Sequence, residues 1–135
     1  MHIALRFTDA INEIIQLDIS SLNKLERIIG VHVSLTIEFS HSMSIITSEW
    51  VHLEQPFLDE YKDLRKSYEL KFRSLIEHCM QEGDFVQLDS ELALFSMLST
   101  LRWLYSWYDA DNPLGKDELE EQMIHCLIKG LLVRA

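Results

Sequence analysis

Glycine and proline are scarce in this sequence, with four glycines and two prolines in 135 residues. No Asn-Gly or Asp-Gly pair marks a hairpin, and no segment sustains the alternation of apolar and polar residues that is typical of a half-buried strand. Strands therefore have almost no support, and the sequence predicts an all-α fold. A chain of this length forms one domain over residues 1–135 and buries a substantial core.

Long apolar runs and targeting signals are also missing. No uninterrupted apolar segment approaches the ~18–20 residues that a membrane-spanning helix needs. The start of the chain, Met1-His2-Ile3-Ala4, lacks the basic region and apolar stretch of a secretory signal. We therefore expect a cytoplasmic protein with no membrane partner. The two cysteines, Cys79 and Cys126, are predicted to be reduced, buried thiols.

Basic residues are few, and the formal net charge is −10. The 12 lysines and arginines do not gather into a stripe, so the chain lacks the positive surface that neutralises DNA phosphates. By itself, this chain is not expected to bind DNA.

Motifs for catalysis are absent. The sequence has no Gly-rich phosphate loop, no Gly-x-Ser-x-Gly elbow and no Cys-x-x-Cys pair. Glu49-x-x-His52 has the spacing used in di-iron helical bundles, but such sites need two of these pairs and two further glutamates. The nearest second pair, Glu121 and His125, is one residue too far apart. We predict no enzyme activity, no metal and no cofactor, and an ordinary interfacial position for His52.

Apolar residues recur every three or four positions in six segments, which predicts a six-helix bundle. Ser20 or Ser21 is expected to cap the second helix and Gly83 to end the fourth, while Pro56 suits the first turn of the fourth. The predicted ranges are 3–17, 21–39, 44–53, 57–81, 90–108 and 117–133, with a break at Ser40-His41-Ser42.

The fifth predicted helix has two different sides. At 100° per residue, one side gathers small residues and two tryptophans, and the other gathers bulky apolar residues. The first side favours close approach of a second helix, and the second side favours a core. The small side holds Ala93, Ser96, Ser99, Thr100, Trp103, Ser106 and Trp107, and the bulky side holds Leu94, Met97, Leu98, Leu101, Leu104, Tyr105 and Tyr108.

Two polar residues on apolar helices have alternative interpretations. His32 lies on the apolar stripe of the second helix, where it either forms one hydrogen bond in the core or contacts a ligand. Arg102, on the fifth helix, either reaches solvent past Glu91, pairs within a dimer, or meets an anionic group of a ligand.

The order of several motifs between Glu54 and the end of the chain resembles the C-terminal, ligand-binding domain of TetR-family transcriptional regulators. These motifs are the charged helix 58–69, Gly83-Asp84-Phe85 with Asp89 after it, the stretch from Trp103 to Trp107, the turn Pro113-Leu114, and Lys129-Gly130-Leu131. The resemblance implies a repressor whose helix-turn-helix DNA-binding domain lies upstream, so that this chain is a fragment or a truncated homologue. DNA would be bound only through that N-terminal domain.

The resemblance also implies a homodimer, in which the last two helices of each subunit form a four-helix bundle, and an apolar small-molecule pocket among the second to fifth helices. The pair Tyr68-Glu69 and the Trp-x-x-x-Trp spacing are most similar to regulators of fatty-acid, acyl-CoA or steroid catabolism. The candidate ligand-binding residues are His32, Leu35, Phe39, Met43, Trp50, Tyr61, Tyr68, Met97 and Leu101. The candidate dimer-interface residues are Ala93, Ser96, Thr100, Trp103, Trp107, Leu119, Met123, Leu127 and Leu131.

Two other functions compete with this interpretation. The chain could be a helical protein-interaction module without a pocket, or a metal-dependent enzyme built on a helical bundle. An enclosed apolar pocket favours the ligand-sensing domain, a solid core favours the interaction module, and convergent carboxylates around a metal favour the enzyme.

Overall fold

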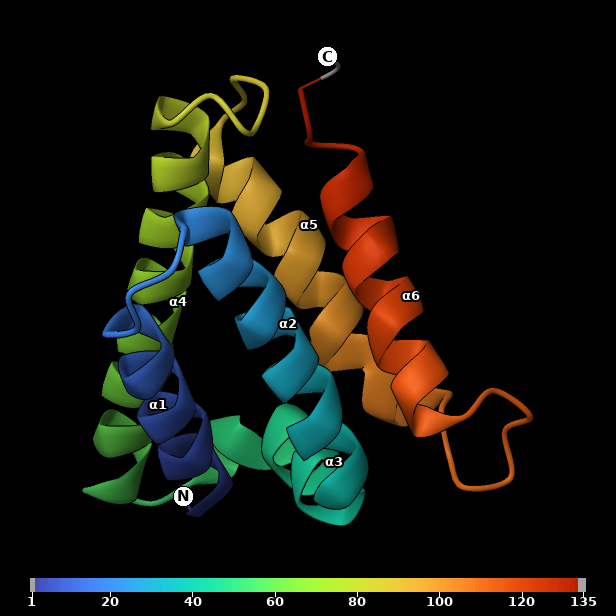
Figure 1. The fold of residues 1–135 in the computed structure, drawn as a ribbon. Coiled ribbons are helices and arrows are strands. Elements are labelled where there is room, and N and C mark those ends of the chain that lie inside the picture. Colours follow the sequence, from blue (N-terminus) through green and yellow to red (C-terminus); the bar gives the residue numbers. More distant parts are fainter. Residues whose placement is uncertain (1, 134–135) are drawn as a thin grey trace.

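Six α-helices make up most of the computed structural model, which describes residues 2–133 (Figure 1). The all-α prediction is confirmed. An isolated antiparallel bridge between Phe85 and Leu132 is its one exception within the described residues. The helices are α1 (His2–Ile15), α2 (Ser21–Glu38), α3 (Ser40–Glu49), α4 (Phe57–Gln81), α5 (Ser90–Trp103) and α6 (Lys116–Lys129), with 3-10 turns η1 (Trp50–His52) and η2 (Leu104–Ser106).

Local capping residues explain several helix ends. The Ser20 hydroxyl accepts a hydrogen bond from the Asn23 amide at 3.1 Å, and an Asp89 carboxylate oxygen accepts one from the Leu92 amide at 2.9 Å. Gly83, with φ of +87°, follows α4 in the left-handed conformation that favours glycine. The predicted bounds of α4 and the predicted starts of α2 and α5 are confirmed.

Other helix ends differ from the prediction. The first helix ends at Ile15 rather than at residue 17. The break expected at residues 40–42 lies at Phe39, because Ser40 already begins α3. The exposed Ser40, His41 and Ser42 are tolerated in a helix since their propensities cost only tenths of a kcal/mol. The third helix therefore spans 40–49 instead of 44–53, and η1 follows it.

The end of the chain is also shorter in helix than predicted. The fifth helix ends at Trp103 and continues as η2, and the sixth ends at Lys129 instead of residue 133. After α6 the backbone turns to the loop that follows α4: the Val86 amide donates to the Leu131 carbonyl at 2.8 Å, and the Val133 amide donates to the Asp84 carbonyl at 2.9 Å. These bonds take the place of the helical hydrogen bonds that the prediction implies for residues 130–133.

Helix α2 lies at the centre of the bundle and packs against α1, α4 and α6. In Figure 1, α4 and α6 lie at opposite edges, α5 runs behind α2, and α3 crosses the end of the bundle near the start of α1. The core between these helices is apolar and fully enclosed. Its most buried members include Leu25, Ile29 and Val33 of α2, Phe72 and Ile76 of α4, and Leu98 and Leu101 of α5.

Burial confirms most of the two sides predicted for the fifth helix, although Tyr105 and Tyr108 of the bulky side are only half-buried. The bulky residues Leu94, Met97, Leu98, Leu101 and Leu104 are buried. On the other side, Ser96, Ser99, Thr100, Trp103, Ser106 and Trp107 are exposed, whereas Ala93 is buried. A stripe of exposed small and aromatic residues thus follows the outside of α5.

The two cysteines are both free thiols, but only one is buried. Burial raises the pKa of Cys79 to about 12, with the nearby Asp84 and Glu82 acting in the same direction. Cys126 is exposed on α6, so the prediction of a buried thiol is correct for Cys79 and wrong for Cys126. Among the described residues, no helix combines the length and hydrophobicity needed to cross a membrane.

Candidate functional site

A cavity of about 100 Å³ lies between the N-terminal halves of α1 and α4 and the helix α3. Aliphatic and aromatic side chains form most of its wall, and a few polar groups converge at one part of it, as is typical of small-molecule sites. The lining residues are Ile3, Ala4 and Phe7 of α1, His32 of α2, Met43, Ile46 and Thr47 of α3, Trp50 of η1, Tyr61, Leu64, Arg65 and Tyr68 of α4, and Arg102 of α5.

His32 and Tyr68 form a buried polar pair in this wall. Nδ1 of His32 lies 3.1 Å from the Tyr68 hydroxyl, and the ring of Phe7 packs on the imidazole with 4.6 Å between centroids. Burial raises the pKa of Tyr68, so the phenol keeps its proton. If the Tyr68 hydroxyl donates to Nδ1, the proton of His32 is on Nε2, and only the Nε2–H donor lacks a partner. If Nδ1–H instead donated to the hydroxyl oxygen, both the hydroxyl proton and the lone pair of Nε2 would lack partners, so the first arrangement is favoured.

The imidazole of His32 is uncharged at neutral pH. Burial, and secondarily the positive charge of Arg102, lowers the pKa of His32 from 6.5 to about 3. Nε2 of His32 is buried and has no hydrogen-bond partner within residues 2–133. The cavity wall therefore carries a neutral imidazole with one unused N–H donor.

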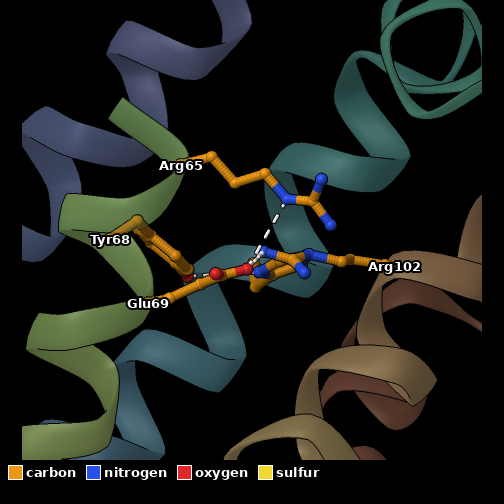
Figure 2. A network of polar contacts seen from close by, with 5 residues as sticks. Arg65, Tyr68, Glu69 and Arg102 are labelled. Atoms are coloured by element: carbon orange, nitrogen blue, oxygen red, sulfur yellow. Dashed lines mark hydrogen bonds and ion pairs between the residues drawn. The ribbon is translucent and has the colours of Figure 1, made fainter. Parts of the chain in front are cut away.

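Two arginines and one glutamate form an ion-pair cluster beside this pair (Figure 2). Arg102 Nη2 donates to Glu69 Oε2 at 2.7 Å, and Arg65 Nε lies 3.5 Å from the same oxygen. In Figure 2, Arg65 and Glu69 come from α4, and Arg102 reaches toward them from α5. The guanidinium of Arg65 also lies 5.0 Å from the ring centroid of Trp50, within range of a cation–π contact.

The sequence model described as "Tetracyclin repressor-like, C-terminal domain" matches residues 18–131. The chain belongs to this family. The fold agrees, since helices of this number and order also form the C-terminal domains of TetR regulators. Members of the family are in general transcription regulators and not enzymes. No curated protein sequence matches the chain significantly.

Several solved TetR-type structures share the fold at low sequence identity. The ketosteroid transcriptional regulator KstR2 of Mycobacterium tuberculosis superposes with a TM-score of 0.91 at 17% identity, over 98% of this chain and 68% of that one. AibR, solved in complex with isovaleryl coenzyme A and operator DNA, gives 0.81 at 18%, over 94% and 71%. PfmR from Thermus thermophilus gives 0.83 at 20%, over 98% and 74%.

The predicted ligand-binding residues of this TetR-type domain fall into two groups. Met97 and Leu101 are 1% and 0% exposed in the central core and do not line the cavity. Leu35 and Phe39 are also outside its lining; Phe39 is half-buried, with the guanidinium of Arg6 5.2 Å from its ring centroid. Five of the nine predicted residues do line the cavity: His32, Met43, Trp50, Tyr61 and Tyr68.

Sequence reasoning missed the contribution of α1 and of Arg65. The pocket was expected among the second to fifth helices, yet Ile3, Ala4 and Phe7 supply one wall. The signal was present, because Ile3 and Phe7 are on the same apolar stripe as Ile11, at spacings of four. Arg65 lies four residues after Tyr61 and three before Tyr68, which places all three on one face of α4.

The structure also locates Arg102 and the pair of Glu49 and His52. It shows a contact that is not among the alternatives for Arg102, an ion pair within the subunit to Glu69, next to the cavity. Glu49 and His52 lie 3.8 Å apart with largely exposed side chains. Within the described residues, no group of three or more His, Cys, Asp or Glu side chains is arranged to hold a metal ion.

The predicted interface residues differ in how much surface they offer to a partner. Ala93, Leu119 and Met123 are buried within the subunit, at 4%, 3% and 8% exposure, and have little area left for a second copy. Leu127 and Leu131 are half-buried. The exposed members are Ser96, Thr100, Trp103 and Trp107.

Stability should depend on pH through His32. Because its pKa is lowered from 6.5 to about 3 in the folded state, the unfolded chain binds one more proton between these values. The free energy of unfolding therefore has its full value above pH 6.5. Below pH 6.5 it decreases as the pH is lowered, by up to about 1.4 kcal/mol per pH unit for this one group. Urea unfolding of His32→Gln at pH 7, 5.5 and 4.5 should show a shallower loss than the parent protein.

The matched control is His41→Gln, at an exposed histidine of α3. This variant should keep the pH dependence of the parent protein. Equal slopes for His32→Gln and the parent would show that His32 does not control the acid sensitivity.

Proposed function

We propose that this chain is the effector-binding and dimerisation domain of a TetR-like transcriptional repressor, and that it binds a small, mainly apolar molecule in the cavity described above. The observation that carries the proposal is the wall of that cavity, where aromatic and aliphatic residues surround one polar region formed by His32, Tyr68 and Arg102. Such a wall suits a ligand with an apolar body and one polar end.

Fatty acids and acyl-CoA molecules are the ligand classes that we favour. Among proteins of similar fold, AibR was solved with isovaleryl coenzyme A, and KstR2 is named a ketosteroid regulator. The volume of about 100 Å³ is below the roughly 300–1,000 Å³ of drug-sized sites, which supports a short or medium-length apolar group.

A homodimer through α5 and α6 is the second part of the proposal. Large apolar residues on this face remain in contact with solvent: Leu92 and Trp103 are 64% and 63% exposed, and Trp107 is 50% exposed. A groove beside them is lined by residues of both helices, including Ser96 of α5 and Leu127 of α6. A second copy of the same stripe covers both apolar surfaces at once, as a two-fold interface requires.

The third part of the proposal is that DNA is recognised outside residues 1–135. A net charge of −10 disfavours contact with phosphates, so we propose that operator DNA is bound by a separate N-terminal helix-turn-helix domain. Ligand binding in this domain would then alter how two such DNA-binding domains are held in the dimer.

Thermal unfolding with a panel of ligands tests the sensing function. A ligand at a free concentration 100 times its Kd stabilises the folded protein by about 2.7 kcal/mol, which corresponds to a rise in Tm of roughly 10 °C for a domain of this size. We expect at least one member of a panel of fatty acids, acyl-CoAs and aromatic effectors to raise Tm in a dose-dependent way.

A cavity-filling variant provides the control. Thr47 lines the cavity, so Thr47→Trp should abolish the ligand-induced rise in Tm. The neighbouring Ser48 is exposed, and Ser48→Trp should keep the rise. If no ligand of the panel changes Tm, the sensing function is refuted and the interaction module is favoured.

A further inference from the structure

The ion pair between Arg102 and Glu69 lies at the polar edge of the cavity and connects α5 to α4 (Figure 2). Arg102 and Arg65 both line the cavity, whereas Glu69 is not part of its lining. A single oxygen, Oε2 of Glu69, serves both guanidinium groups, at 2.7 Å from Arg102 and 3.5 Å from Arg65. Two cations therefore share one carboxylate.

The wall of the cavity has an excess of positive charge. Its lining contains two arginines and no acidic residue, in a chain whose overall net charge is −10. A guanidinium has five N–H donors, and within residues 2–133 the Arg102 side chain gives one hydrogen bond, to Glu69, so its other donors can bind a ligand. The site favours an anionic group and disfavours a cationic one.

His32 independently indicates that an oxygen atom of a ligand belongs in the cavity. Its side chain lines the cavity and is 4% exposed, and its Nε2 has no hydrogen-bond partner within residues 2–133. Buried donors in folded proteins are nearly always paired. Because the Tyr68 hydroxyl already occupies Nδ1, the Nε2–H group requires an acceptor oxygen, which a ligand can supply.

We infer that the effector is a small apolar monocarboxylate, whose carboxylate competes with Glu69 for Arg102 and accepts a hydrogen bond from Nε2 of His32. Glu69 then acts as an internal substitute for the ligand's charge when the cavity is empty. This inference rests on the proposed sensing function. It also assigns a route of regulation, since exchange of partners at Arg102 breaks the ion pair between α4 and α5 one residue before the exposed Trp103.

Calorimetric titration with matched pairs of ligands tests the charge requirement without any variant. The pairs are octanoate with octan-1-ol, and 3-phenylpropanoate with 3-phenylpropan-1-ol, at neutral pH. The members of a pair have similar apolar bodies and differ mainly in the charged group. In at least one pair the acid should bind about tenfold or more tightly than the alcohol, because hydrogen bonds to charged groups are worth about 1.5–3 kcal/mol.

Variants of the ion pair test the competition. Glu69→Gln removes the internal carboxylate and should tighten acid binding by about three- to tenfold, while alcohol binding changes less than about twofold. Arg102→Gln should abolish the preference for the acid. A purely structural ion pair would weaken both ligands together, so a gain for the acid alone is specific to competition.

Glu77→Gln is the matched control for Glu69→Gln. Glu77 is on the same helix and pairs with Arg73 at 3.5 Å, away from the cavity. This substitution should leave both titrations unchanged.

The possible results separate this inference from the function on which it rests. Equal binding of acid and alcohol, or an unchanged acid affinity in Glu69→Gln, overturns the competition. Binding of octanoyl coenzyme A without binding of either acid overturns the monocarboxylate and leaves the sensing function in place. If neither these compounds nor the wider panel binds, both are overturned.

Discussion

Replacing Trp103 with glutamate should convert the protein from a dimer to a monomer at micromolar concentration. Trp103 is 63% exposed on the outer stripe of α5, where the proposed interface brings two copies together. The substitution removes a large aromatic contact from each subunit and places an unpaired carboxylate in an apolar seam, at a cost of several kcal/mol. Light scattering should show the mass fall from twice 15.9 kDa to 15.9 kDa.

Leu70→Glu is the control for added charge at an exposed apolar position. Leu70 is 55% exposed on α4, at the opposite edge of the bundle from α6 (Figure 1), and its replacement should leave the dimer intact. A dimeric Trp103→Glu variant would place the interface elsewhere. A monomeric parent protein would refute dimerisation through this domain.

Trp103 is a better probe of the interface than several residues that the sequence also suggested. Leu119 and Met123 are 3% and 8% exposed, so a charge at either position would disrupt the subunit itself. The apolar stripe of α6 predicts that these residues face an apolar surface. It cannot distinguish a neighbouring helix of the same chain from one of a partner, because both bury the same side of the helix.

Helix number, type and several boundaries could be predicted because they depend on neighbours in sequence. Ser20, Asp89 and Gly83 act on amides or torsions within a few residues of themselves, and their effects are visible in the sequence. The end of α6 could not be predicted in this way. It depends on hydrogen bonds between residues 131–133 and 84–86, which are distant in sequence.

The candidate site shows the same contrast. Tyr61 and Tyr68 could be assigned to the pocket because aromatic residues seven positions apart share one face of a helix. The pairing of Arg102 with Glu69 joins residues 33 positions apart on different helices, and only the packing of α4 against α5 brings them together. The sequence leaves three alternatives open for Arg102, which are solvent, a contact within a dimer and a ligand, and an ion pair with Glu69 is not among them.

Replacing Phe72 with alanine should cause the largest loss of stability among single substitutions in α4. Phe72 is fully buried in the central core, where its ring lies 6.0 Å from that of Tyr68. Truncation to alanine removes the apolar transfer free energy of the ring and leaves a cavity, which together cost about 3–5 kcal/mol. Urea unfolding at fixed protein concentration should show a lower midpoint with a similar slope.

The control for this truncation is Phe57→Ala, in the first turn of the same helix. Phe57 is 53% exposed, so its loss should change the free energy of unfolding by less than about 1 kcal/mol. A loss for Phe72→Ala no larger than that for Phe57→Ala would show that the core does not close around α4 as described. A large loss for Phe72→Ala alone means that α4, which carries Tyr68 and Glu69, is anchored by the core on one side, so that exchange at Arg102 takes place against a fixed helix.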